Sequence, residues 1–150
     1  MSTERQKIAQ AVLQIIPSVM RFLTAELRQT NSPLSPPQLG VLTLLAEDSY
    51  NLSELAEQHG VSLPTMSSTV SKMVAAGWVQ RKRSSQDRRV VMLALTPVGQ
   101  TLLEEIGQQF IGKVAEQLTA VPTDKLNELQ GGLTLLQTVF TPFTIKNKDC

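Results

Sequence analysis

The sequence has 150 residues, of which 41% are hydrophobic, and a formal net charge of +1. This length suggests one domain with a sizeable buried core, and the near-neutral charge gives no nucleic-acid signal for the whole chain. Cys150 is the only cysteine, which excludes a disulfide framework or a cysteine-based metal site within one chain. The start, MSTERQKIAQ, lacks the apolar core of a signal peptide, and no apolar run approaches about 18 residues. We therefore expect a cytoplasmic protein without a membrane span.

Residues 4–30 are expected to form the first helix, because apolar residues recur there at steps of three and four. This apolar stripe consists of Ile8, Val12, Ile15, Val19 and Phe22. Pro17 lies inside the segment, so a kink or short break is expected near it. After the turn NSPLSPP, Ser35 is expected to cap a helix over 36–46. The buried face of that helix would hold Leu39, Leu42 and Leu45.

Two short helices around a tight turn are expected in the segment LSELAEQHGVSLPTMSSTVSKMVAAGW. Ser53 can cap the first helix, which carries Leu55 and Ala56, and Gly60 supplies the turn. A small residue such as Ala56 lets the two helices approach each other, so the spacing is typical of a helix-turn-helix.

The second of these helices has two contrasting faces. Ser62 can cap it, Pro64 is tolerated in its first turn, and Gly77 is expected to stop it. Its inner apolar face would consist of Met66, Val70 and Met73. Its outer face would carry Thr65, Ser68, Ser71 and Lys72. Short hydroxyls and a lysine can approach base edges and phosphates without steric conflict.

The stretches WVQRKR and RVVMLALT are expected to form two strands around a turn at 84–87. Val91, Leu93 and Leu95 alternate to one side and would anchor the second strand in the core. Thr96 and Pro97 then begin a helix that reaches about residue 119. A last helix follows AVPT and carries a second stripe, and the polar tail TIKNKDC is expected to be loose. The second stripe consists of Leu126, Leu129, Leu133, Leu136 and Phe140.

Positive charge is concentrated in residues 72–89, which hold six basic residues and one acid, Asp87. The rest of the chain has eight basic and twelve acidic residues, so it is net negative. A focused basic site for nucleic acid would produce this asymmetry, although a solvated hairpin tip would produce it as well. A helix-turn-helix followed by a hairpin is a winged helix.

These motifs together resemble the MarR family of bacterial transcription regulators over nearly the whole chain. The most specific match is DRRVVMLALTPVG (87–99), which fits the family's wing signature, and AAGWVQRK and LSELAEQHGVS fit the segments before it. The resemblance implies one domain over 1–150 that is mainly α-helical with a small β-hairpin wing. In that domain 35–96 would be the winged helix-turn-helix and 97–120 a long linking helix. The segments 1–34 and 121–150 would be N- and C-terminal dimerisation helices.

The resemblance also implies which residues meet DNA. Contacts from the recognition helix would be Pro64, Thr65, Ser67, Ser68, Ser71 and Lys72. Contacts from the wing would be Arg81, Arg83, Arg88 and Arg89, of which Arg89 would enter the minor groove. Asp87 would accept hydrogen bonds from Arg89 or a neighbouring arginine and orient it, although it could instead be a simple turn former. Many relatives have arginine or glutamine where this recognition helix has serine and threonine, so specificity is expected to depend on the wing, DNA shape and water.

Both apolar stripes have the spacing of a helix–helix seam, and one small domain cannot readily cover both. The resemblance assigns them to a homodimer interface, although packing within one chain is the alternative. The interface residues would be Ile8, Val12, Ile15, Val19, Leu129, Leu133, Leu136 and Phe140. A two-fold dimer predicts a roughly palindromic operator whose half-sites lie about 10 base pairs apart.

The predicted function is therefore a sequence-specific regulator of transcription that binds double-stranded DNA as a homodimer, most simply a ligand-responsive repressor. The alternative is a winged-helix module that binds proteins and not DNA. No enzyme, cofactor or metal site is expected, because phosphate-loop and metal-binding spacings are absent from the sequence. Many relatives bind a small aromatic acid, so a small aromatic or anionic effector is considered, with Arg21 and His59 as polar candidates. The first helix has no cysteine, which excludes thiol sensing there.

Overall fold

The computed structural model describes residues 3–143, so the tail TIKNKDC and Cys150 lie outside the described residues. Its elements are α1 (Thr3–Gln29), α2 (Pro36–Glu47), α3 (Leu52–His59), α4 (Leu63–Ala75), β1 (Val79–Arg83), β2 (Val91–Leu95), α5 (Pro97–Gln117), α6 (Thr123–Phe140) and a 3-10 turn, η1 (Thr141–Phe143). The two strands pair antiparallel, from Val79 opposite Leu95 to Arg83 opposite Val91. The prediction of a mainly helical chain with one β-hairpin is confirmed.

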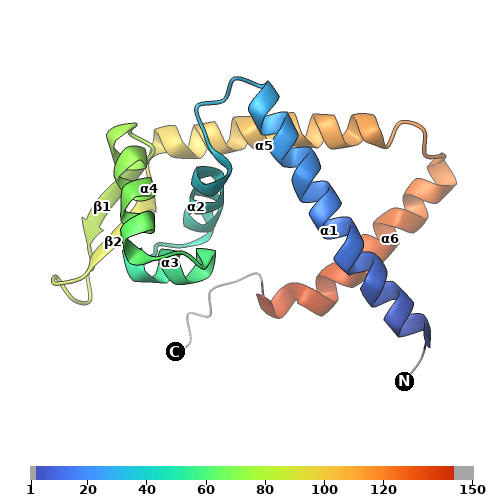
Figure 1. Cartoon of the computed structure of the whole chain (residues 1–150), viewed down its shortest axis with the longest axis horizontal. Helices are drawn as coiled ribbons and strands as arrows, with labels where there is room; N and C mark the ends of the chain where they lie inside the picture. Colours follow the sequence, from blue (N-terminus) through green and yellow to red (C-terminus); the bar gives the residue numbers. More distant parts are fainter. Residues whose placement is uncertain (1–2, 144–150) are drawn as a thin grey trace.

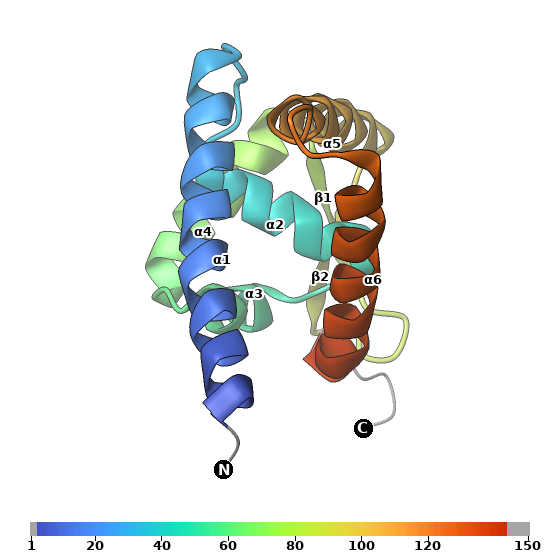
Figure 2. The ribbon, with the colours of Figure 1, turned by 90° about the vertical axis from the view of Figure 1, so that its right-hand side faces the viewer.

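The helices and the hairpin form a compact lobe with long helical extensions (Figure 1). Helices α2, α3 and α4 gather around the root of the β1–β2 hairpin, whose tip projects away from them. Helix α5 leads out of this lobe, and α1 and α6 lie toward its far end. In Figure 1 α1 and α6 cross, but in Figure 2 they stand apart, so neither helix covers the other along its length.

Side-chain caps explain where most helices begin. Ser35 Oγ accepts from the backbone N–H of Gln38 at 3.4 Å, and Gln38 Oε1 accepts from the N–H of Ser35 at 2.9 Å. Thr96 Oγ1 accepts from the N–H of Gly99 at 3.0 Å. Each cap satisfies a backbone donor that has no partner within its helix.

The cap predicted for α3 was wrong, because Asn51 and not Ser53 begins this helix. Asn51 Oδ1 accepts from the N–H of Glu54 at 2.8 Å, and Glu54 Oε1 accepts from the N–H of Asn51 at 3.0 Å. This reciprocal pair is a capping box, which satisfies two backbone donors at once. Ser53 lies inside the first turn.

Helix α1 is unbroken from Thr3 to Gln29. Of the kink or short break expected near Pro17, the break therefore does not occur. Proline removes one backbone donor, and the exposed surface of this helix leaves the freed carbonyl open to water. An 18-residue window of α1 has a mean hydropathy of 1.4, so by length and composition alone this helix could cross a membrane. The expectation that no such segment exists is therefore corrected, because the average over a window tolerates polar residues that interrupt a continuous apolar run.

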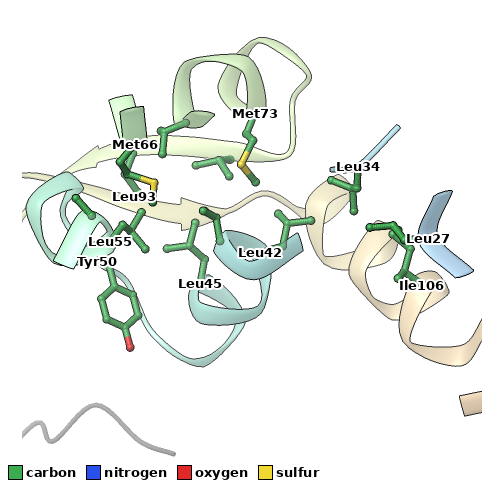
Figure 3. Close-up of a cluster of buried hydrophobic side chains, with 14 residues drawn as sticks. Leu27, Leu34, Leu42, Leu45, Tyr50, Leu55, Met66, Met73, Leu93 and Ile106 are labelled. Carbon is green, nitrogen blue, oxygen red and sulfur yellow. The ribbon is translucent and has the colours of Figure 1, made fainter. Parts of the chain in front are cut away.

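The hydrophobic core runs as one strip from the lobe to the junction of α1 and α5 (Figure 3). In the lobe, Leu55 and Met73 have no exposed surface, and Met66 lies beside them. At the other end Leu27 of α1 packs with Ile106 of α5. Burial of these apolar side chains is the main stabilising contribution to the lobe.

Two predictions about burial require correction. Val91 is 43% exposed and does not anchor the wing, whereas Leu93 is buried and Leu95 is half-buried. The reason is that Val91 pairs with Arg83 at the outer end of the hairpin, where no neighbouring element covers its side chain. In α2 Val41 joins Leu42 and Leu45 in the core, while Leu39 is only half-buried.

The outer edge of β2 is paired with the loop between α2 and α3. Tyr50 donates its N–H to the carbonyl of Leu93 at 3.3 Å, and Leu93 donates its N–H to the carbonyl of Tyr50 at 2.7 Å. This one-residue bridge gives β2 a backbone partner on both sides. The wing is therefore fixed to the lobe through its second strand.

Candidate nucleic-acid interface

Helix α4 presents a polar face because its other face is fixed in the core. Met66, Val70 and Met73 are buried, as predicted from their spacing. Ser62 caps the helix and also donates its hydroxyl to Thr65 Oγ1 at 2.9 Å. We call the exposed side of α4 the hydroxyl face. It consists of Pro64, Thr65, Ser67, Ser68, Ser71 and Lys72, all of which are exposed.

The end of α4 leads directly into the wing. Gly77 has a φ of +83°, a conformation that suits glycine, and Trp78 donates its N–H to the carbonyl of Met73 at 3.0 Å. This turn ends the helix where the sequence predicted. Helix α4 and β1 are in contact (Figure 1), so the hydroxyl face and the wing lie next to each other.

The wing loop, residues 84–90, is organised by local hydrogen bonds. Ser84 Oγ accepts from the N–H groups of Gln86 at 3.2 Å and Asp87 at 3.4 Å. Ser84 donates its own N–H to the carbonyl of Val90 at 2.9 Å, and Val90 donates to the carbonyl of Asp87 at 3.0 Å. The positive tip is therefore held by a defined turn.

Asp87 and Arg89 form a bidentate pair at the tip of the wing. Arg89 Nε donates to Asp87 Oδ1 at 3.2 Å and Arg89 Nη2 to Oδ2 at 3.4 Å, while the N–H of Arg89 donates to Oδ1 at 3.0 Å. The Arg89 side chain hydrogen bonds, followed by its backbone bond, hold the pKa of Asp87 below the ordinary value of 3.8. The Arg89 side chain remains 91% exposed, so the pair directs the guanidinium without hiding it.

Arg83 has a second role that sequence reasoning missed. Its Nη1 donates to the carbonyl of Arg88 at 2.9 Å and so connects the end of β1 to the far side of the wing loop. The other predicted wing residues are exposed as well, Arg81 in the middle of β1 and Arg88 in the wing loop. The spacing of residues along the chain could not reveal this contact, because it depends on how the loop folds back.

The root of the wing is closed by a tight approach between backbones. The carbonyl of Trp78 accepts from the N–H of Thr96 at 3.0 Å, and Thr96 Oγ1 donates to the carbonyl of Gly77. A Cβ on Gly99 would lie 2.2 Å from the Trp78 carbonyl oxygen. Only glycine therefore allows α5 to begin so close to the wing, which gives a physical reason for this position in the motif DRRVVMLALTPVG.

Most predicted dimer residues are exposed in the single chain. Ile8 is 62% exposed and Leu133 56%, and Ile15, Val19, Leu129 and Phe140 are also exposed. Val12 and Leu136 are half-buried. Contiguous apolar surface of this kind usually marks an interaction site.

The chemical groups of this surface can donate hydrogen bonds to phosphate. Within residues 3–143 no group of three or more His, Cys, Asp or Glu side chains could hold a metal ion. The guanidinium groups and Lys72 can donate to phosphate oxygens, and the hydroxyls can donate to phosphates or base edges.

Comparisons with known proteins agree with this geometry. Residues 34–91 match the family model described as MarR family. The chain is 31% identical over 99 residues to the HTH-type transcriptional regulator FarR of Neisseria gonorrhoeae, a match that covers 65% of this chain and 66% of FarR. It is 30% identical over 105 residues to the organic hydroperoxide resistance transcriptional regulator of Bacillus subtilis, covering 69% of this chain and 70% of that protein.

The chain spans between 53% and 66% of the length of the first three curated relatives that it matches. Among solved structures, Streptococcus pneumoniae FabT in complex with DNA superimposes with a TM-score of 0.63 at 22% identity. That match covers 93% of this chain and 99% of FabT. At this identity the likeness shows that the two chains share a fold.

Proposed function

The chain belongs to the MarR family, and on this premise we propose that it regulates transcription by binding double-stranded DNA as a homodimer. The observation that carries the proposal is the exposed positive wing, in which Asp87 directs the guanidinium of Arg89 outward. A protein-binding winged helix, the alternative function, has no need of five basic residues at its wing. The solved DNA complex of FabT, which has the same fold, adds support.

In the proposed complex the hydroxyl face of α4 enters the major groove, and Arg89 enters the adjacent minor groove. A narrow minor groove concentrates negative potential and attracts a guanidinium. On the hydroxyl face only Lys72 is suited to reading guanine and there is no arginine, so DNA shape and bridging water would supply much of the specificity. Arg81, Arg88 and Lys72 would contact phosphates, and Arg83 would support the loop.

The proposed dimer is formed by α1 and α6 of two copies, with residues 35–96 as the reading unit. Support comes from the apolar stripes of both helices, which the chain's own packing leaves largely exposed. A dimer with two-fold symmetry would place two α4 helices in successive major grooves, about one helical turn apart on a palindromic operator. The simplest regulatory role is a cytoplasmic repressor that blocks promoter access.

A second copy is a better partner for α1 than a lipid bilayer. Gln10, Gln14 and Arg21 recur at helical spacing on the side of α1 opposite the apolar stripe. A helix that crosses a membrane alone is expected to be apolar all round, whereas a one-sided stripe suits a helix–helix interface. Deletion of 121–150 should yield monomers or aggregates in sedimentation experiments, and a stable native-like dimer would contradict the interface.

We also propose a small-molecule effector for this regulator. A cavity of about 610 Å³ lies between α1, α5 and the lobe, and His59 is part of its wall. Arg21, the other polar candidate, does not line the cavity, and its Nη2 donates to Ser18 Oγ at 3.5 Å. An occupant that favours one spacing of the two lobes would shift the population between dimers that fit and misfit DNA.

DNA binding can be tested by selecting bound fragments from the source genome and measuring affinity for them by fluorescence anisotropy over a range of salt. Affinity should fall steeply with salt, because each neutralised phosphate releases counterions. Arg89→Ala should cost about 1–3 kcal/mol of binding free energy with folding intact. Lys113→Ala, which removes an exposed charge from α5, is the matched control and should have little effect. Salt-independent binding, or equal affinity of Arg89→Ala and the wild type, would contradict the proposal.

A further inference from the structure

The reading unit, residues 35–96, leaves few large apolar side chains exposed. The structure describes every residue of this range, and the exposed ones are Val61 at 39%, Leu63 at 48% and Val91 at 43%. Val61 and Leu63 flank Ser62, the cap of α4, and Leu63 is the first residue of that helix. We call Val61 and Leu63 the apolar corner. Single exposed apolar residues are common on protein surfaces, so the meaning of this pair depends on its location.

The apolar corner lies at the end of the lobe toward which the wing tip projects. Helix α4 rises from α3, and its first turn lies at the end of the lobe away from α5 (Figure 1, Figure 2). The tip of the β1–β2 hairpin points toward the same end. In a helix-turn-helix the N-terminal residues of the recognition helix contact base edges in the major groove. The apolar corner therefore belongs to the surface that would meet base pairs.

The polar groups around the apolar corner are partly used within the chain. Ser62 Oγ accepts from the N–H of Thr65 at 3.3 Å and donates to Thr65 Oγ1 at 2.9 Å. A hydroxyl has one proton, so Ser62 has none left to donate to DNA. The serines of the hydroxyl face follow only from Ser67 onward. The start of α4 is therefore less polar than its sequence, with a serine at the cap, indicates.

Folding accounts for Val61 but not for Leu63. Val61 stands just before the cap, the position of a hydrophobic staple, and its N–H donates to the carbonyl of Ala56 at 3.0 Å. The first turn of a helix gains stability from proline, acidic or small polar residues, and leucine supplies none of these benefits. Leu63 also leaves about half of its surface in water, so burial of this side chain by a partner would be favourable.

The bases of DNA offer one group that matches an exposed leucine in the major groove. This group is the C5-methyl of thymine, since the other groups on the base edges are hydrogen-bond donors and acceptors. A leucine placed against a polar base edge would remove water from it without replacing the lost hydrogen bond, which is unfavourable. The chemistry of the apolar corner therefore favours an A·T pair whose thymine lies beneath it.

We propose that Leu63 contacts the 5-methyl group of one thymine in each operator half-site and is a specificity-determining residue. The inference rests on the proposed DNA binding and deepens it, because it names the base feature that the start of α4 reads. Val61 adds apolar surface to this contact. The hydroxyl face then reads the neighbouring base pairs through polar groups.

The test is a uracil scan of an operator duplex selected from the source genome. Each symmetric pair of thymines is replaced by deoxyuridine, which removes only the methyl group, and the affinity is measured by fluorescence anisotropy at fixed salt. At one pair of positions the loss should be roughly four-fold for one half-site and roughly ten- to fifteen-fold for both, as expected for one methyl group buried in each. A cytosine at that position should bind more tightly when it carries a 5-methyl group.

Variants connect the methyl group with Leu63. Leu63→Ala should bind the thymine and uracil duplexes equally, whereas Leu63→Met, which stays apolar and of similar size, should keep the preference. The preference is a ratio measured with one protein, so it does not depend on the fraction that is folded. Val98→Ala is the matched control, because Val98 is 60% exposed in the first turn of α5, at the opposite end of the lobe (Figure 1). It should leave both the affinity and the preference unchanged.

Two results would overturn the inference while leaving the proposed DNA binding intact. One is salt-dependent operator binding that is insensitive to uracil at every position. The other is a preference for thymine that persists in Leu63→Ala, which would assign the methyl contact to another side chain. Failure to bind any genomic fragment would contradict the proposed function and this inference together.

Discussion

Replacing Gly99 with alanine should loosen the junction between α5 and the wing. The added Cβ would lie 2.2 Å from the Trp78 carbonyl oxygen and 3.0 Å from its carbon, and both are backbone atoms that cannot rotate away. The Trp78 peptide must therefore move by roughly 1 Å to restore van der Waals contact. That movement disturbs the hydrogen bond from the N–H of Thr96, which is 3.0 Å long.

The magnitude follows from these two costs. Overpacking of a close contact costs about 1–3 kcal/mol, and a weakened backbone hydrogen bond adds about 0.5–1.5 kcal/mol. The gain from replacing glycine by alanine in a helix offsets up to about 1 kcal/mol. We expect Gly99→Ala to lower the free energy of unfolding by about 1–3 kcal/mol.

Urea denaturation at fixed protein concentration measures this change. Gly112→Ala is the matched control. Gly112 lies on the same helix, and a Cβ added there would meet nothing within 4 Å. The control should be neutral or slightly stabilising. If Gly99→Ala were as stable as the wild type, or if both variants lost equal stability, the close approach to Trp78 would not be the reason for glycine. DNA affinity should also fall in Gly99→Ala, because the wing root shifts.

Three further predictions concern the DNA-binding surface. Lys72→Ala should weaken binding to all sequences equally and reduce the salt slope by about 1 in anisotropy titrations, whereas loss for one sequence only would indicate base reading. Because Arg89 hydrogen bonds depress the folded pKa of Asp87, the pair should be complete above pH 3.8 and be lost as the pH falls through the lowered pKa. Carboxyl NMR should accordingly show Asp87 titrating at higher pH in Arg89→Ala, and an unchanged titration would refute the pairing. Arg83→Gln should weaken DNA binding less than Arg89→Ala while increasing backbone mobility of the wing loop by NMR relaxation, and an unaffected loop would contradict its supporting role.

The sequence by itself determined the helices, the turn and the hairpin. The reason is that these elements depend on interactions between residues that are close in sequence. Steps of three and four placed Met66, Val70 and Met73 on one face of α4, and the cap and the glycine at its ends set its limits. The pair between Asp87 and Arg89 was also predictable, because the two residues are close in sequence and a carboxylate accepts readily from a guanidinium.

Only the tertiary structure decided which candidates contact one another and which are covered. Alternation placed Val91 on the same side as Leu93 and Leu95, but a strand has a buried face only where another element lies over it. Three further features bring together segments that are distant in sequence or that fold back on themselves. They are the approach of Trp78 to Gly99, the hydrogen bond from Arg83 to Arg88 and the cavity at His59. Periodicity carries no information about such contacts, because it records the direction of a side chain and not what lies opposite.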